Sequence, residues 1–311
     1  MLRSVLVAVV VAGCGSSSYR IDGDIHRGAL SAGDAARHHA VLAAAEAAWA
    51  RRADPAQAAA AIARYEEAVR IKDDDWRTYA RLSQALFFLA DAHLGFQAMG
   101  GDYPYDVDDI ADPAAAARYR RTLRHGYEVA LRGMAARSPE FEQRLRAGID
   151  LEVAIQVIRK DAAPLLYWYV SNLASSARAE GFTALFRTRS KIVACIDQMR
   201  VIDPAYYHAG ADRLLGIYYA AAPPVVGGNL DRSKRHFDAA IAADPGYQMT
   251  SVFVAEFLAR KLKDRALFEQ RLQAVIASPP DQDGELAAEN AAARKKAQRL
   301  LGRIDRYFDS Q

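Results

Sequence analysis

The sequence comprises 311 residues with a mass of 34.1 kDa, of which 51% are hydrophobic and 25% are charged. These proportions are typical of a globular protein and exclude both a disordered chain and a polytopic membrane protein. The 41 basic residues are interspersed with 38 acidic ones, so no basic face indicates binding to nucleic acid. Cys14 and Cys195 are too few for a disulfide framework or a cysteine-based zinc site.

The N-terminal segment has the pattern of a secretory signal. Arg3 supplies a positive start, the apolar run Ser4–Val11 is shorter than the ~20 residues of a membrane-spanning helix, and small residues precede Cys14. The residues ending at Cys14 resemble a bacterial lipobox, whose cysteine carries lipid chains that anchor the protein. We therefore expect a signal peptide over residues 1–13, and a lipidated Cys14 that begins a flexible tether over residues 14–33. A plain N-terminal membrane helix is the alternative.

The residue after this cysteine bears on location. In bacterial lipoproteins an aspartate there usually retains the protein in the inner membrane, whereas this chain has Gly15. The resemblance therefore implies an outer-membrane anchor that faces the periplasm. The lipid would be the only link to the membrane.

Helical periodicity dominates the rest of the chain, and no convincing period-two pattern predicts a strand. Four dipeptides each place an N-cap acceptor before a proline at the first helical position: Asp54-Pro55, Asp112-Pro113, Ser138-Pro139 and Asp203-Pro204. The sequence predicts one all-α domain over residues 34–311, with about twelve helices. We expect them at 34–52, 55–72, 75–98, 113–137, 139–158, 162–180, 187–202, 204–221, 230–243, 247–262, 264–277 and 284–308.

A recurring pattern marks several of these helices. A small or apolar residue is followed four positions later by a larger apolar or aromatic one, then by Ala or Met, and then by Pro or Asp. The pattern occurs at Ala61–Asp73, Tyr127–Pro139, Ile192–Pro204 and Ser233–Pro245. It resembles the second helix of a tetratricopeptide repeat. We expect degenerate tetratricopeptide-like helical hairpins in an α-solenoid or bundle, with insertions between some pairs; a generic helical bundle is the alternative.

No motif for chemistry stands out. The chain has no Gly-rich phosphate loop, no nucleophile elbow and no H-E-x-x-H sequence. Four aspartates between Asp106 and Asp112 lack the spacing of an EF-hand, so we interpret them as a solvated loop with Asp112 as a cap. Cys195 lies in an apolar helical stretch and is predicted to be a buried, inert thiol. We expect no enzymatic activity, no catalytic residue, no cofactor and no metal site.

The aromatic stretches around Tyr167 and Tyr218 each have two interpretations. They could pack in the core, or they could form the wall of a hydrophobic cavity in which a few polar groups orient a ligand. Adjacent tyrosines on one helix cannot both face the same core. The residues that we select as cavity candidates are Tyr167, Trp168, Asn172, Tyr218, Tyr219, Pro223 and Val225.

The C-terminal third carries a string of short motifs. Its first part contains Asp203-Pro204-Ala205-Tyr206, Gly210-Ala211, Leu215-Gly216-Ile217-Tyr218-Tyr219, Pro223-Pro224, Gly227-Gly228-Asn229 and Phe237-Asp238-Ala239-Ala240. Its second part contains Asp264, Phe268, Leu272, Glu285-Leu286-Ala287, Asn290, Ala293-Arg294-Lys295-Lys296-Ala297, Leu300-Leu301 and Tyr307-Phe308. Locally, Gly227 and Gly228 permit positive φ, so the chain can reverse there before Asn229.

Together with Leu166-Tyr167-Trp168 and the lipobox, this string resembles the T component of tripartite ATP-independent periplasmic (TRAP) transporters. The resemblance implies a lipoprotein that assembles into a homo-oligomer, typically a trimer. It also implies a hydrophobic tunnel for an apolar or organic-acid ligand, and a periplasmic solute-binding protein as the partner. No nucleic acid is expected to bind. The alternative is a tetratricopeptide-repeat lipoprotein of outer-membrane assembly or secretion machinery.

Overall fold

The computed structural model describes residues 23–279 and 284–308. Over these ranges the protein is all-α, as predicted, and contains no strand. None of the described helices has the length and apolar character needed to cross a membrane. The predicted signal peptide, Cys14 and the first part of the predicted tether lie outside the described residues.

The helices follow one another along the chain with short connections. The first half contains α1 (Ala32–Trp49), α2 (Pro55–Ile71), α3 (Trp76–Leu89), α4 (Gly95–Ala98), α5 (Pro113–Arg137), α6 (Pro139–Arg146), α7 (Leu151–Ala154) and α8 (Ala163–Glu180). The second half contains α9 (Phe182–Ile202), α10 (Tyr206–Ala221), α11 (Leu230–Ala243), α12 (Met249–Phe253), α13 (Arg260–Leu262), α14 (Arg265–Ala277), α15 (Ala287–Leu301) and α16 (Ile304–Phe308). Two π-helical segments, Ala90–Leu94 and Val254–Ala259, interrupt this series.

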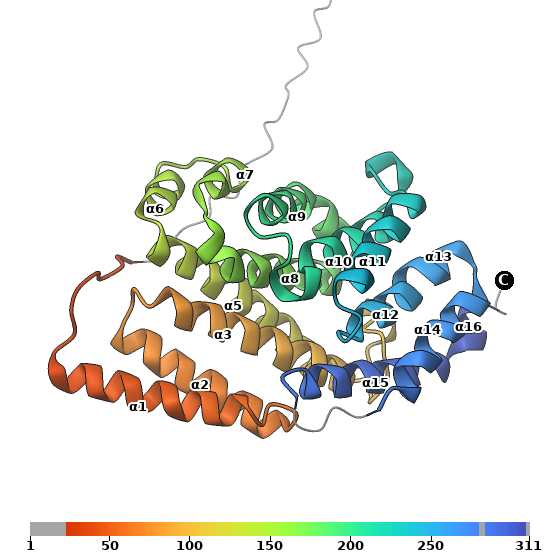
Figure 1. Ribbon diagram of the computed structural model, residues 1–311, viewed down its shortest axis with the longest axis horizontal. Helices are drawn as coiled ribbons and strands as arrows, with labels where there is room; N and C mark the ends of the chain where they lie inside the picture. Colours follow the sequence, from red (N-terminus) through yellow and green to blue (C-terminus); the bar gives the residue numbers. More distant parts are fainter. Residues whose placement is uncertain (1–22, 280–283, 309–311) are drawn as a thin grey trace, which may run out of the picture.

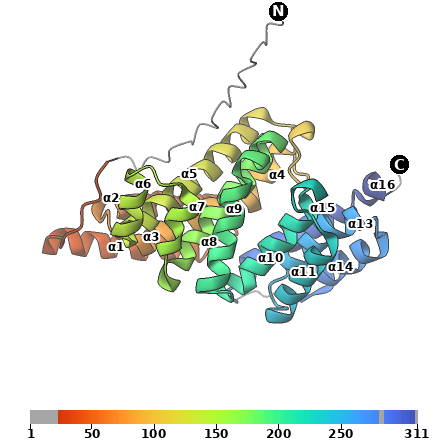
Figure 2. The same ribbon diagram turned by 90° about the horizontal axis from the view of Figure 1, so that it is seen from above.

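The most extensive contacts between helices join α5 with α8, α10 with α11, α3 with α5, α1 with α2 and α8 with α9 (Figure 1). The N-terminal helices α1–α3 lie at one end of the molecule, and α13, α14 and α16 lie at the other (Figure 2). Helix α15 runs back toward the first pair, where Arg52 Nη2 lies 2.6 Å from Glu289 Oε2. This return joins the two ends of the chain in one body.

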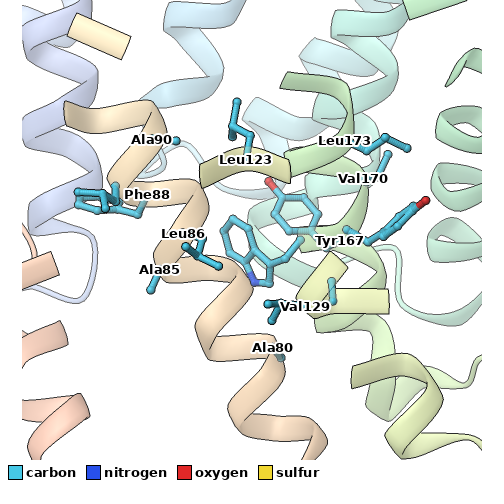
Figure 3. Packing of buried hydrophobic residues seen from close by; sticks show 14 of the residues in the cluster. Ala80, Ala85, Leu86, Phe88, Ala90, Leu123, Val129, Tyr167, Val170 and Leu173 are labelled. Carbon is cyan, nitrogen blue, oxygen red and sulfur yellow. The ribbon is translucent and has the colours of Figure 1, made fainter. Parts of the chain in front are cut away.

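The centre of the core lies where α3, α5 and α8 meet (Figure 3). Leu86 of α3, Leu123 of α5 and Val170 of α8 are all buried there. Most apolar residues of the recurring sequence pattern are also interior, and Ser233 is buried with them: Tyr65, Met134, Ile196, Met199, Phe237 and Ala240 are buried. The pattern therefore predicted correctly which face of each helix packs.

Three of the four predicted N-caps are confirmed. The side chains of Asp54, Asp112 and Ser138 each accept a hydrogen bond from a backbone N–H in the first turn of the following helix. The prediction at Asp203-Pro204 is wrong, because Asp203 ends α9 and α10 begins only at Tyr206. The first residues of α10 have a left-handed backbone, so a right-handed helix does not start at the proline.

Several predicted helices are interrupted or shifted. The predicted 75–98 and 247–262 helices each contain a π segment, and Gly148, with φ of +76°, ends the first part of the predicted 139–158 helix. The predicted 187–202 helix begins earlier, at Phe182, and the predicted 284–308 helix breaks near Gly302.

The described end of the predicted tether is held against the helices. Ile25 is buried, Arg27 Nη2 lies 2.6 Å from Glu142 Oε2, and the backbone N–H of His26 donates to Asp73. These contacts correct the prediction that the chain is free up to residue 33, because a buried apolar side chain fixes it near residue 25.

The chain reverses between α10 and α11 at the predicted glycine pair. Gly227 has φ of +100°, and Asn229 caps α11 by accepting a hydrogen bond from the backbone N–H of Arg232 at 2.8 Å. A Cβ at Gly228 would lie 1.8 Å from the carbonyl oxygen of Ala222. Only glycine fits at this close approach of two backbone segments.

We predict that Gly228→Ala lowers the free energy of unfolding by about 1–3 kcal/mol, because a backbone carbonyl cannot move aside as a flexible side chain would. Urea unfolding monitored by circular dichroism measures the change. Gly28→Ala is the matched control, since a Cβ there meets no atom within 4 Å. Equal stability of the two variants would contradict the close approach.

Candidate functional site

A cavity of about 300 Å³ lies among α8, α9, α10 and the second π segment. Its walls are mostly apolar and include Ile192 and Ile196 of α9 and Leu214 and Ile217 of α10. A concave, largely apolar space of this volume with a few polar groups is typical of a site for a small ligand.

The open side of the cavity is aromatic. Phe182 and Phe186, which both line it, remain 66% and 52% exposed. The guanidinium of Arg189, another lining residue, lies 5.4 Å from the centre of the Phe186 ring. Two large apolar side chains exposed beside an apolar cavity mark this rim as an interaction surface.

A polar cluster lies at the cavity wall, where Asp91, Tyr103 and Arg178 line it. Each π segment contributes one carboxylate: Asp91 from the first and Glu256 from the second. The ammonium of Lys296 lies 2.6 Å from Asp91 Oδ1, and Arg178 Nη2 lies 2.7 Å from Glu256 Oε1. The Tyr103 hydroxyl also donates to Glu256. The acidic groups of this wall therefore each have a basic partner.

The electrostatics of this cluster follow from burial and charge. Burial and the neighbouring Glu256 carboxylate raise the pKa of Tyr103 well above its ordinary value, so its hydroxyl stays protonated. Burial opposes the charge of Arg178, but Glu256 outweighs it and raises the pKa of that guanidinium. Arg178 therefore keeps its positive charge at neutral pH.

A third polar group on the cavity wall is Arg213, whose side chain is 1% exposed. Its Nη1 donates to the carbonyl of His208 at 2.9 Å, and its Nη2 donates to the carbonyl of Tyr207 at 3.0 Å and to the Tyr167 hydroxyl at 2.6 Å. The guanidinium also lies 4.4 Å from the centre of the Tyr247 ring. Aromatic faces and carbonyl oxygens thus surround the buried cation.

These carbonyls face Arg213 because the backbone there is left-handed. Tyr207, His208 and Ala209 have φ of +49°, +58° and +54°. Each such residue costs roughly 1–2 kcal/mol relative to a right-handed conformation. Arg213 and the His208 imidazole, whose Nδ1 lies 2.6 Å from Asp244 Oδ2, hold the turn in place. The turn positions the Tyr207 ring against Trp168 and Tyr247.

Only some of the residues that we selected from the sequence line the cavity in the structure. Tyr167, Tyr218 and Pro223 line the cavity. Trp168 lines a separate void of about 20 Å³, and Tyr219 stacks on His236.

The remaining two selected residues lie away from the cavity. Asn172 is fully buried and donates to Ser83 and to the carbonyl of Trp168. Val225 is 92% exposed, and its neighbour Val226 lines the cavity instead.

Sequence reasoning did not select Arg213, Ser171, Asp91, Arg178 or Glu256. One signal for Arg213 was present: it shares a helix face with Ala209, Gly216 and Ala220 at three- and four-residue spacing. A charged residue within an otherwise small and apolar face indicates a buried charge. Asp91 and Glu256 gave no such signal, because the π segments that hold them depart from α-helical spacing.

Cys195 is fully buried, as predicted, and burial raises the pKa of its thiol. A thiol that stays protonated and inaccessible is chemically inert. Asp112 caps α5, also as predicted, and Asp109 in the same acidic loop pairs with Arg306.

The small void adjoins the cavity. It shares Phe87, Asp91, Tyr247 and Met249 with the cavity. A groove of about 680 Å³ beyond it shares Phe88 and Ala292 with the void. The void therefore adjoins both larger spaces and is the smallest of the three.

Comparison with protein families found one that covers most of the chain. The family described as "TRAP transporter T-component" matches residues 56–308. A comparison with curated proteins found no match.

We predict that Asp244 makes stability depend on pH. Burial acts to raise the pKa of the Asp244 carboxyl. The His208 imidazole and the N–H groups of Gly246 and Tyr247 outweigh burial and hold this pKa below its usual range. Its contribution is therefore present above the ordinary aspartate pKa of about 4 and is lost as pH falls through the lowered value.

Urea unfolding over a pH series tests this. Asp244→Asn removes the titrating group, so its unfolding free energy should fall less on acidification than that of the wild type. Asp108→Asn, at an exposed position in the acidic loop, is the control and should behave as the wild type. Identical pH profiles for Asp244→Asn and the wild type would show that the His208 contact contributes nothing.

Proposed function

The chain belongs to the TRAP transporter T-component family, and we propose that it is a lipid-anchored periplasmic scaffold of such a transporter. In this role it holds a small ligand in its cavity beside the solute-binding protein. The family makes it an accessory component of a transport system. The observation that carries the proposal is the apolar cavity of about 300 Å³ with an exposed aromatic rim.

The cavity, the small void and the groove adjoin one another, which supports a tunnel through the subunit. An apolar ligand would enter from the rim and meet the narrow point at the void of about 20 Å³. Trp168 and Tyr207 both line this void, so the predicted tunnel residue Trp168 would act at the constriction and not in the wider cavity. Because the aromatic rings at this point are closely packed, passage would require them to move.

The rim supports docking of a solute-binding protein. Exposed aromatic side chains are enriched at the energetic centres of protein interfaces, because they bury a large apolar area. A partner seated over Phe182 and Phe186 would cover the cavity and receive its ligand without exposing it to water. The trimeric assembly that the resemblance implies would place several such rims in one complex.

The proposal also includes the anchor and the repeats. The signal over residues 1–13 and the lipobox cysteine Cys14 support a lipoprotein of the bacterial envelope, most consistent with an outer-membrane anchor that faces the periplasm. The paired helices with buried pattern residues support an origin in degenerate tetratricopeptide repeats. The role is binding and scaffolding, with no covalent step and no cofactor.

We predict that Phe186→Glu weakens binding to the solute-binding protein of the same transporter at least tenfold, because it removes an aromatic contact and buries a charge. Titration calorimetry with the two purified proteins measures the affinity. Val201→Glu is the matched control: Val201 is also exposed on α9 but does not line the cavity. Equal effects of the two variants, or no association of the wild-type proteins, would contradict the proposal.

We predict that Cys14→Ala abolishes lipidation, because the thiol is the only acceptor that the lipobox offers. Cells that express the chain with radiolabelled palmitate should label the wild-type protein, and the label should be absent from the variant. Fractionation should then find the variant in the periplasm. Label on Cys14→Ala, or none on the wild type, would overturn the anchor.

A further inference from the structure

Sequence and structure disagree at the start of α10. Asp203 and Pro204 have the pattern of a helix start, with a side-chain acceptor before a proline whose fixed φ suits the first helical position. In the structure Asp203 ends α9 instead, and Tyr207, His208 and Ala209 have φ of +49°, +58° and +54°. None of these three is a glycine, so the left-handed conformation crowds each Cβ. Local preference therefore favours a right-handed helix where the structure has a left-handed turn.

Contacts from outside the turn hold it in this form. Arg213 donates from Nη2 to the carbonyl of Tyr207 and from Nη1 to the carbonyl of His208. The His208 Nδ1 lies 2.6 Å from Asp244 Oδ2, and the imidazole stacks on the Tyr247 ring with 4.7 Å between ring centres. In a right-handed turn the two carbonyls would point along the helix axis and would no longer converge on Arg213. The two hands of this turn are thus stabilised by different interactions, which is the property of a two-state element.

The hand of the turn determines where the Tyr207 ring lies. The ring lines the small void of about 20 Å³, and its centre lies 4.6 Å from that of Trp168 and 5.5 Å from that of Tyr247. A space of this size holds about one water molecule, so it excludes an organic ligand. Successive side chains turn in opposite senses around left-handed and right-handed helices, so the ring cannot keep this place when the hand changes. The left-handed turn therefore closes the space between the cavity and the groove.

We propose that residues 205–209 are a gate between the cavity and the groove. The left-handed turn is its closed state. In its open state α10 begins at Pro204 as a right-handed helix, with Asp203 as the cap, and the Tyr207 ring leaves the void. The inference rests on the proposed tunnel and adds the element that moves. An apolar ligand that fills the widened void binds the open state alone, so it shifts the population toward that state.

Substitutions that favour one hand of the turn test the gate. Glycine adopts a left-handed conformation without penalty and weakens a right-handed helix, so Ala209→Gly should lower the open population roughly tenfold or more. Ala211→Gly is the matched control: Ala211 is also a buried alanine of α10 but is right-handed in both states, so the populations should not change. His208→Ala should raise the open population several-fold, because it removes the contacts with Asp244 and Tyr247 and introduces a residue that favours a right-handed helix.

Fluorine NMR of the protein labelled with 5-fluorotryptophan measures the two populations. The chain has three tryptophans, and Trp168→Phe identifies the resonance of the one that contacts Tyr207. Saturation transfer and relaxation dispersion should detect a minor state at Trp168 in the wild type, on the microsecond-to-second timescale of such transitions. Trp76, which packs against Arg77, is the internal reference.

The gate predicts a minor state that shrinks in Ala209→Gly, grows in His208→Ala and is unchanged in Ala211→Gly. A single Trp168 state in the wild type would overturn it. Equal exchange in the wild type and in Ala209→Gly would also overturn it, because the exchange would then be ring motion without a change of backbone. Neither result bears on the proposed function, since docking of the solute-binding protein is measured separately by calorimetry. Absence of that docking would overturn the proposed function, and the exchange measurement does not depend on it.

Discussion

The buried guanidinium of Arg213 is the interaction on which the site depends. It donates to the two carbonyls that the left-handed residues Tyr207 and His208 turn inward. Without it, these carbonyls would lose their donor, and little would offset the roughly 1–2 kcal/mol that each left-handed residue costs. The left-handed turn also positions Tyr207 beside the small void between the cavity and the groove. One side chain thus shapes the wall, supports the constriction and presents a charge to the ligand space.

The two π segments explain how polar groups come to lie at the wall of an apolar cavity in this all-α protein. A π turn adds a residue to a helix and changes the direction of the side chains that follow, and such turns are frequent at functional sites. Here the first segment places Asp91 on the cavity wall, where it pairs with Lys296, and the second places Glu256 against Arg178 of the same wall. Buried ion pairs of this kind specify a geometry more than they stabilise it.

The features that could be predicted from the sequence are those that depend on neighbouring residues in the chain. Caps at Asp54, Asp112 and Ser138, the glycine turn before α11 and the buried pattern residues all follow from backbone chemistry and apolar spacing. The left-handed turn after Pro204 and the two π segments escaped prediction, because tertiary contacts stabilise them against local preference. For the same reason the aromatic stretch at Tyr167 and Trp168 could be selected, while the side that each ring faces could not.

The most direct test of the account is a crystal structure of the protein grown with decanoate that carries a terminal bromine. The anomalous signal of bromine locates the tail without reference to any prior interpretation. The account predicts bromine in the cavity between α9 and α10, toward Phe182 and Phe186. Bromine in the groove beside Lys295 or on the outer surface, with the cavity filled only by water, would contradict it.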